Sequence, residues 1–462
     1  MNETTGPTMT HLSPQRHAAF RDWGHALKAC ILGVVALVFL PSAQAVPSFA
    51  RQTGQSCVAC HAGGQFPELT PYGRLFKMTG YTNGARGNPL AAMVVGDWTK
   101  TKNNSDGAGG ALSNSDKKFI FDFGSLFVAG KITDNVGGFS QFTYNRQDDH
   151  VHSDNLDVRY ADQNDVAGNQ LIWGVTLHNN PSVQDVWNTA PAWAYPYINS
   201  STGAFGGMPY ATLLEQQLQV AGTGAYVYAN KTWYAEFSTY RTADKMFNVL
   251  SMGSKAGDPN YPLTYLSGSN PYARVAYTRE WDASNLMLGA FAMNANVLPL
   301  DGSNRPVNGP STHYRDTGVD AQYQFLMDPH TITAQARYIH ERINDDIASP
   351  AYGGPAVLNS FRLKGSYVYQ AKYGASLAMS NITGSADAGA YASGNQNFGS
   401  ASNTPNTRLW TPEIFWLPVQ NVRVGLQYNH FTRYNGKAVN YDGFGRNARD
   451  NNTLFLYLWA AY

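Results

Sequence analysis

From about residue 90 to the C-terminus, apolar and polar residues alternate one by one along the chain. The segment 422–429 reads Val-Arg-Val-Gly-Leu-Gln-Tyr-Asn, and the segments 319–325 and 331–338 alternate in the same way. A period of two gives a β-strand one apolar face and one polar face. The pattern therefore predicts that most of the chain is all-β. A soluble β-sandwich would alternate as well, so other features have to separate the two architectures.

About sixteen candidate strands can be placed in this region, and most of them are about ten residues or longer. They start near residues 92, 118, 135, 155, 169, 211, 231, 272, 284, 314, 329, 360, 373, 407, 421 and 452. About ten residues is the length that a tilted strand needs to cross a bilayer. An even number of strands is also typical of bacterial outer-membrane barrels. Strand length and strand number therefore favour a transmembrane barrel.

The connections between these strands alternate in length. Short turns are expected at 131–134, 282–283 and 327–328, and long loops at 101–117, 179–210, 243–271, 297–313, 343–359, 384–406 and 434–451. Outer-membrane barrels have short periplasmic turns and long outer loops, whereas a soluble sandwich has no reason to sort its loops in this way.

The C-terminal segment 454–462 is apolar and ends on an aromatic residue, Tyr462. Outer-membrane barrels commonly end in such a strand, although many of them end on Phe. The alternative is a buried final strand of a soluble domain. Taken with the strand and loop patterns, this segment predicts that residues 91–462 form a transmembrane up-and-down β-barrel of about 16 strands.

The first 45 residues have the three parts of a secretory signal. Basic residues precede an uncharged run from Cys30 to Leu40, which leads to Ala43-Gln-Ala45. A short membrane anchor is the alternative, but a run of 11 residues is too short to span about 30 Å of hydrocarbon. We therefore expect residues 1–45 to be a signal peptide that is cleaved near Ala45, which implies export.

Composition narrows the classes of function. The chain has 462 residues, with 33 Lys or Arg against 32 Asp or Glu, and 13% of its residues are aromatic. Such a chain is not disordered, and without a basic excess it is not expected to bind nucleic acid. Three cysteines are too few for a disulfide scaffold. The sequence has no evident catalytic triad, phosphate loop or paired-carboxylate motif, so hydrolytic enzymes rank low.

After the signal only two cysteines remain, and they form the segment Cys57-Val-Ala-Cys60-His61. This is the attachment pattern of c-type haem, in which each thiol forms a thioether with a haem vinyl group and the imidazole binds the iron. A zinc half-site would need two further Cys or His ligands nearby, and none follows within thirty residues. A redox Cys-x-x-Cys has no need of His61. We therefore predict one covalently bound c-type haem, held by Cys57, Cys60 and His61.

The sixth iron ligand is open between two methionines. No histidine occurs between His61 and His150, and Met78 and Met93 are the nearby thioethers. Met78 belongs to a short amphipathic segment, whereas Met93 shares one face of a predicted strand with Asp97 and would face the lumen with it. Met93 is the preferred ligand and Met78 the alternative. Ordinary packing of either side chain and a water-ligated iron also stay open.

The segment 46–81 resembles the fused cytochrome–porin family of the bacterial outer membrane, best known from iron-oxidising bacteria. The likeness rests on Pro47-Ser-Phe-Ala-Arg51, on Cys57–His61 and on Pro67-Glu-Leu69, and beyond about 36 residues it rests on barrel texture alone. The family joins an N-terminal monohaem segment to a sixteen-stranded barrel. The resemblance implies a cytochrome c segment at 46–90 in front of the barrel.

The resemblance also assigns roles to three further residues. Arg51 is expected to pair with a haem propionate, and Pro67 and Leu69 to shape or cover the haem edge. A surface arginine and simple loop packing are the plainer interpretations of these residues. A segment of this size is too small to hold a stable core alone, so we expect it to plug the periplasmic half of the barrel lumen.

The resemblance implies electron transfer across the outer membrane. Family members take electrons from outside the cell, chiefly from ferrous iron, and pass them to periplasmic carriers. We therefore expect three partners: Fe(II) or a similar external donor, a periplasmic carrier such as a soluble cytochrome c, and outer-membrane lipid. The chain would then act as an outer-membrane iron oxidase.

Two other functions stay open. One is a porin or solute channel with a structural or regulatory haem, and the other is a soluble periplasmic c-type cytochrome with a β-domain of binding function. The loop 147–154, rich in Asp and His, could gather divalent iron, although a solvated acidic loop is the plainer interpretation.

Overall fold

The computed structural model describes residues 47–64, 67–146, 149–181, 183–189, 198–201, 208–216, 218–251, 253–258, 261–345, 355–391 and 399–462. All of them belong to one compact unit, residues 44–462. The predicted signal peptide lies outside the described residues, as do Gln147 and Asp148 of the predicted metal-gathering loop. In the described part of the chain, no helix is both long enough and apolar enough to cross a membrane.

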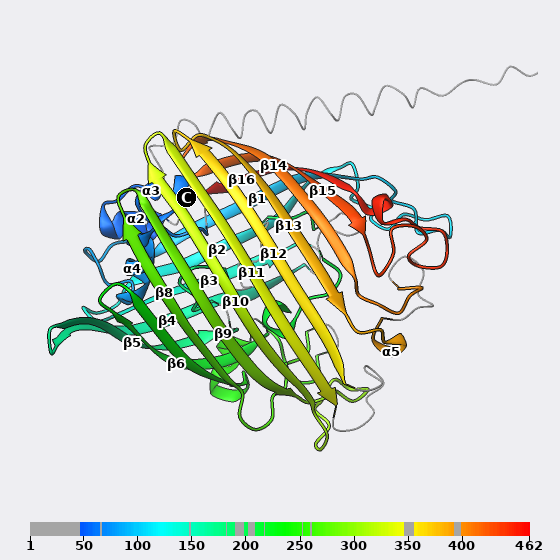
Figure 1. The fold of residues 1–462 in the computed structure, drawn as a ribbon, viewed down its shortest axis with the longest axis horizontal. Helices are drawn as coiled ribbons and strands as arrows, with labels where there is room; N and C mark the ends of the chain where they lie inside the picture. Colours follow the sequence, from blue (N-terminus) through cyan, green and yellow to red (C-terminus); the bar gives the residue numbers. More distant parts are fainter. Residues whose placement is uncertain are drawn as a thin grey trace, which may run out of the picture. The chain divides into compact units, whose positions relative to one another are not determined.

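Sixteen antiparallel strands, counted within the described residues, close into a barrel (Figure 1). They are β1 (Leu90–Thr101), β2 (Phe119–Lys131), β3 (Val136–Asn145), β4 (His150–Val166), β5 (Asn169–Asn179), β6 (Val220–Ala229), β7 (Trp233–Thr242), β8 (Pro271–Trp281), β9 (Ser284–Val297), β10 (Thr312–Met327), β11 (His330–Asp345), β12 (Ala356–Tyr369), β13 (Tyr373–Gly384), β14 (Thr407–Val419), β15 (Val422–Arg433) and β16 (Thr453–Ala461). Each strand pairs with its sequence neighbour, and β1 pairs with β16 to close the ring. The predicted all-β barrel of about sixteen strands is confirmed.

The alternating pattern of the sequence becomes an apolar outside and a polar inside. On β14, Trp410, Ile414 and Trp416 face outward, with exposed fractions of 37%, 61% and 46%, whereas Thr411 and Glu413 are buried in the lumen. A bilayer accepts the apolar face, and the closed ring leaves no strand edge unpaired in it. This division of the two faces is the one that an outer-membrane barrel needs.

Two strand boundaries predicted from the sequence are wrong. The strand expected near residue 211 begins at Val220, because the leucine-rich segment before it does not alternate and packs into the lumen instead. The strand expected near residue 155 begins at His150, so the predicted loop 147–154 is largely the start of β4. The remaining helical elements lie in long connections or before the barrel: α2 (Pro47–Thr53), α3 (Cys57–Cys60), η1 (Ala62–Gly64), α4 (Pro71–Met78), η3 (Leu213–Gln216), η4 (Lys245–Leu250), α5 (Ala388–Tyr391) and η5 (Ala448–Asn451).

The segment 47–81, with α2, α3 and α4, lies inside the ring. It contacts strands all around the barrel: Tyr81 bonds to Asp157 of β4 (2.6 Å), Met78 to Tyr226 of β6 (2.6 Å), Arg74 to Asn285 of β9 (2.8 Å) and Glu68 to Lys364 of β12 (2.8 Å). A segment that touches the inner faces of strands so far apart in a closed ring has to occupy the lumen. The haem that the sequence assigns to this segment stays a prediction.

This segment sits at the end of the barrel where the connections are short. The Cys57 N–H donates to Gln420 in the turn between β14 and β15 (3.2 Å). Val58 shares a groove with Pro329 of the β10–β11 turn and Ala371 of the β12–β13 turn. Figure 1 shows α2, α3 and α4 at one end of the barrel and α5, from a long connection, at the other. Short turns and long loops are therefore sorted to opposite ends, as the sequence predicts.

Candidate haem-binding site

The segment Cys57–His61 is a single helical turn that the following residues clamp in place. α3 ends where the His61 N–H donates to the Cys57 carbonyl (2.8 Å). The Thr70 N–H donates to the Cys60 carbonyl (2.9 Å), and His61 forms an isolated β-bridge with Leu69. These bonds bring the attachment motif and the predicted haem-edge residue Leu69 to one place.

Thr70 and Gly73 fix how α4 approaches the motif. Thr70 caps α4, because its side chain accepts a hydrogen bond from the Gly73 N–H (3.1 Å), and Pro71 occupies the first helical position. A Cβ atom placed on Gly73 would lie 2.2 Å from the Cys60 carbonyl oxygen. Only glycine therefore allows α4 to pack directly against the cysteine-bearing turn.

The motif opens onto a cavity of about 790 Å³, part of which is open to solvent. Its lining residues are Phe49, Ala50, Thr53, Gln55, Ser56, Cys57, Cys60, His61, Pro67, Leu69, Gly73, Phe76, Lys77, Tyr81, Phe139, Val183 and Asn188. Of the residues that the sequence assigns to the haem, Cys57, Cys60, His61, Pro67 and Leu69 line this one cavity.

An aromatic cluster forms much of the cavity wall. The Phe49 ring stacks on Tyr81, with ring centroids 5.3 Å apart, and meets Phe76 edge-on at 5.0 Å. Phe139 of β3 completes the cluster, with its centroid 6.4 Å from that of Phe49. Aromatic side chains bury large apolar areas, so this wall suits a flat apolar group such as a porphyrin.

The protonation states also suit haem attachment. Burial lowers the pKa of His61 to about 4, so its imidazole is neutral near pH 7, and the neutral imidazole is the form that binds a metal. Burial, followed by the neighbouring Cys57, raises the pKa of Cys60 to about 11. The two sulfurs are not joined in a disulfide. The donor set and the aromatic wall therefore suit one c-type haem.

The other predicted contacts lie outside the cavity wall. Arg51 is exposed, and its guanidinium donates to the backbone carbonyls of Asn88 (3.3 Å) and Leu90. Met93 is buried in the apolar cluster that also contains Cys57. Met78 is buried in a different cluster, with Trp187 and Tyr226. The propionate contact and the sixth ligand stay predictions.

The sequence does not identify three residues that the structure brings to the cavity. Val183 and Asn188 come from the long connection between β5 and β6, and Lys77 comes from α4. The Lys77 ammonium donates to the carbonyls of Val183 (2.7 Å) and Asp185 (2.8 Å), and the Asn188 amide donates to the carbonyl of Pro67 (2.5 Å). No local sequence signal marks Val183 or Asn188, because the sequence of the connection predicts only a long loop.

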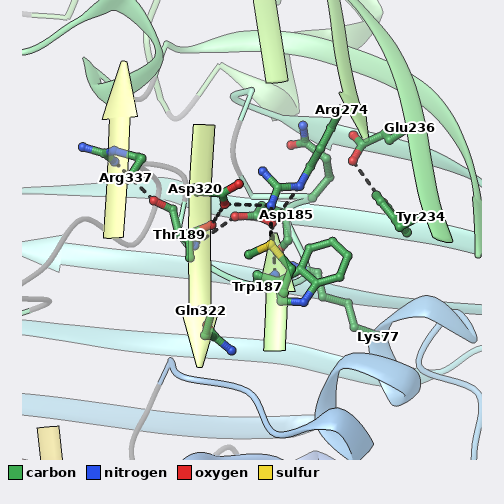
Figure 2. A network of polar contacts seen from close by, with 12 residues as sticks. Lys77, Asp185, Trp187, Thr189, Tyr234, Glu236, Arg274, Asp320, Gln322 and Arg337 are labelled. Carbon is green, nitrogen blue, oxygen red and sulfur yellow. Dashed lines mark hydrogen bonds and ion pairs between the residues drawn. The ribbon is translucent and has the colours of Figure 1, made fainter. Parts of the chain in front are cut away.

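A buried ionic network joins this connection to the inner faces of nearby strands (Figure 2). Arg274 of β8 pairs with Asp320 of β10 (2.7 Å) and lies 3.9 Å from Asp185 of the connection. Its guanidinium also lies over the Trp187 ring, 5.1 Å from the centroid. Farther along the connection, Glu215 pairs with Arg337 and Arg362, on β11 and β12. The connection is therefore anchored to β8, β10, β11 and β12, which lie close together in the ring, and it contacts the segment that carries the cysteines.

The two histidines of the predicted metal-gathering loop 147–154 lie on a strand in the structure. His150 and His152 lie on β4 with ring centroids 5.1 Å apart, and both rings pack against Tyr261. Within the described residues, no group of three or more His, Cys, Asp or Glu side chains is arranged to hold a metal ion.

Comparisons with known proteins bear on the barrel. No family model matches the chain, and no curated protein matches it. Among solved structures it is similar to OmpF of Salmonella typhi in complex with daunomycin (12% identity, 81% of this chain, 97% of that chain, TM-score 0.46). It is also similar to the outer-membrane channel DcaP of Acinetobacter baumannii (13% identity, 81% of this chain, 96% of that chain, TM-score 0.43). A third similar structure is an anion-selective porin from Comamonas acidovorans (11% identity, 81% of this chain, 98% of that chain, TM-score 0.44). The barrel resembles outer-membrane porins, and at these identities the likeness concerns the fold alone.

Proposed function

We propose that this chain is an electron-transfer protein of the bacterial outer membrane. A c-type haem held inside the barrel would receive electrons from an external donor such as Fe(II). A periplasmic carrier, such as a soluble cytochrome c, would accept them. The proposal includes export by the signal peptide 1–45 and insertion of the barrel into outer-membrane lipid.

The place of the attachment motif carries this proposal. Cys57, Cys60 and His61 line one largely apolar cavity, and the segment that bears them occupies the lumen of a closed barrel. The apolar band of an outer-membrane barrel is about 25 Å tall, which is a long way for an electron to cross without a relay. A redox group inside the lumen shortens that distance. A haem on a soluble domain would not need such a position.

Each residue that the sequence assigns to the haem has a task in this proposal. Cys57 and Cys60 would hold the haem covalently, and His61 would bind its iron. Pro67 and Leu69 cover its edge, and the aromatic wall excludes water. When bound, the haem supplies a one-electron site that alternates between ferric and ferrous iron. Met93, or Met78 in its place, is the proposed sixth ligand.

The filled lumen supports transfer of an electron rather than passage of a solute. The connection between β5 and β6 lies against the cysteine-bearing segment through Lys77 and Asn188, and Arg274 fixes it to the barrel wall. Two segments therefore lie in series along the lumen. A donor metal would stay on the outer side, which also keeps insoluble Fe³⁺ out of the periplasm.

A porin or solute channel with a structural or regulatory haem is the second candidate. The observation that favours it is the polar inner face of the strands, which carries Asp157, Arg159 and Arg337, because a polar interior is typical of porin barrels. This candidate predicts that solutes or ions cross the barrel.

The two candidates differ in how the haem responds to Fe(II). Under anaerobic conditions, Fe(II) is added to the purified, oxidised protein in detergent, and the haem absorption bands are followed. Rapid reduction is expected for the native chain and loss of reduction for His61→Ala. A haem that stays oxidised in Fe(II) but responds to dithionite would contradict the Fe(II) proposal and favour the channel.

A further inference from the structure

Two carboxyl groups meet in the lumen above the cysteine-bearing segment. Asp97 of β1 faces inward, as the alternation of that strand requires. Val95 of β1 pairs with Phe123 of β2, and the next residue of β1, Gly96, pairs with Phe121. Asp122 is therefore the extra residue of a β-bulge on β2. Asp122 is buried on the lumen face of β2, as Asp97 is on β1, and the two carboxyl groups are close enough to interact directly.

Both acids are fully enclosed, and their close neighbours are mainly neutral hydroxyl groups. Asp97 is 0% exposed and Asp122 is 2% exposed. Thr99 donates to Asp97 Oδ1 (3.1 Å), and Ser201 of the β5–β6 connection donates to Asp122 Oδ1. The second oxygen of Asp97, Oδ2, accepts no hydrogen bond from any described residue. Within the described part of the chain, the cation that acts on both carboxyl groups is Arg146, which is exposed.

A second carboxyl pair in the same lumen has a different environment. Asp316 of β10 and Glu341 of β11 lie directly opposite each other. Their oxygens accept the backbone N–H groups of Leu214 (2.9 Å) and Leu213 at the start of η3. These backbone donors explain the second pair, because they fasten the β5–β6 connection to the wall. The pair formed by Asp97 and Asp122 has no such donors among the described residues.

Two buried carboxylates in contact repel each other strongly, so either a proton or a cation has to lie between them. We propose that Asp97 and Asp122 bind one hard divalent cation, with the hydroxyls of Thr99 and Ser201 beside them. Carboxylate and hydroxyl oxygens suit Mn²⁺, Mg²⁺, Ca²⁺ and ferrous iron rather than soft thiophilic metals. The unsatisfied Oδ2 of Asp97 gives the cation an oxygen that no protein group competes for.

The position of this site connects it with the cavity. Asp97 lies four residues from Met93 along β1, which is about 13 Å at the usual rise of a strand. Met93 and Val95 belong to the apolar cluster that also contains Cys57. A cation at Asp97 and Asp122 would therefore lie above the haem cavity within the lumen. Its use as the electron donor rests on the proposed function, whereas the binding of a cation does not.

Equilibrium binding of Mn²⁺ to the full chain tests this site without any redox reaction. The electron paramagnetic resonance signal of free Mn²⁺ is measured as the purified protein is titrated, for the native chain, for Asp97→Asn/Asp122→Asn, and for Asp316→Asn/Glu341→Gln as the matched control. We expect one Mn²⁺ per native chain, at least tenfold weaker binding in the first variant, and native-like binding in the control. Migration of the unheated protein as a folded barrel shows that each variant has folded.

Each outcome decides the proposal. Loss of binding in the first variant alone supports a cation site at Asp97 and Asp122. A native chain that takes up no Mn²⁺, or a first variant that binds it as well as the native chain does, overturns the proposal and assigns a shared proton to the pair. A chain that binds Mn²⁺ but whose haem does not respond to Fe(II) would retain the site and lose only the proposed function.

Discussion

A Cys57→Ser/Cys60→Ser variant is expected to assemble as a barrel that carries no covalently bound haem. Cys57 and Cys60 line the cavity, and each thioether bond to the haem needs the sulfur of one of them. The barrel itself should still form, because its strands close through backbone pairing and the cysteines belong to the lumen segment. Haem content per chain, measured after denaturation and extraction of non-covalent haem, is expected to fall from about one to zero.

The third cysteine provides the matched control for this experiment. Cys30 lies in the predicted signal peptide and should be removed with it, so Cys30→Ser is expected to leave the haem content unchanged. Covalent haem in the double serine variant would contradict the assignment of the motif. Folding of the double variant is checked independently by its migration before and after heating.

Replacing Arg274 by methionine is expected to destabilise the folded barrel by about 3–5 kcal/mol, the usual cost of removing one partner from a buried ion pair. Arg274 is 1% exposed, pairs with Asp320 and packs over Trp187. Methionine keeps much of the volume but leaves the carboxylates of Asp320 and Asp185 without their cation. The measurement is the free energy of unfolding by denaturant in lipid vesicles.

Arg279 of the same strand offers a comparison at an exposed position. It is solvent-exposed and lies beside Trp281, with its guanidinium carbon 5.8 Å from the ring centroid. Arg279→Met is expected to change the free energy of unfolding by less than about 1 kcal/mol, because exposed contacts of this kind contribute little. Equal effects of the two substitutions would contradict the anchoring role of Arg274.

The barrel could be predicted from the sequence because one rule applies along its length. In the segment 422–429, as in most of the strands, each side chain faces either the lipid or the lumen. The alternation of apolar and polar residues in the sequence therefore indicates directly which way each side chain points. Short turns such as 282–283 add an independent signal. The ring closure between β1 and β16 then follows from the need to leave no free strand edge in a membrane.

The cysteine motif could be recognised in the sequence because its residues are close together in the chain, and its haem stays a prediction. Cys57, Cys60 and His61 are within five residues, and the segment that contains them resembles a known family over its length. Pro67 and Leu69 are near enough in the chain for the same resemblance to include them, and the structure brings both to the cavity wall.

The entry of the β5–β6 connection into the lumen could not be predicted, because it depends on contacts between residues far apart in the chain. Glu215 meets Arg337 across a separation of 122 residues, and Asn188 meets Pro67 across 121. In the sequence, the leucines near residue 213 look like the start of a strand. Their burial in the lumen is decided by aromatic side chains of β7, β8 and β9 that the local pattern does not include.

Electron transfer into sealed vesicles tests the central claim most directly. The purified, haem-loaded chain is inserted into lipid vesicles that contain oxidised cytochrome c, and Fe(II) is added outside under anaerobic conditions. The account predicts that the enclosed cytochrome c becomes reduced while the iron stays outside, and that His61→Ala abolishes the reduction. Enclosed cytochrome c that stays oxidised, or iron that enters the vesicles together with the electrons, would contradict it.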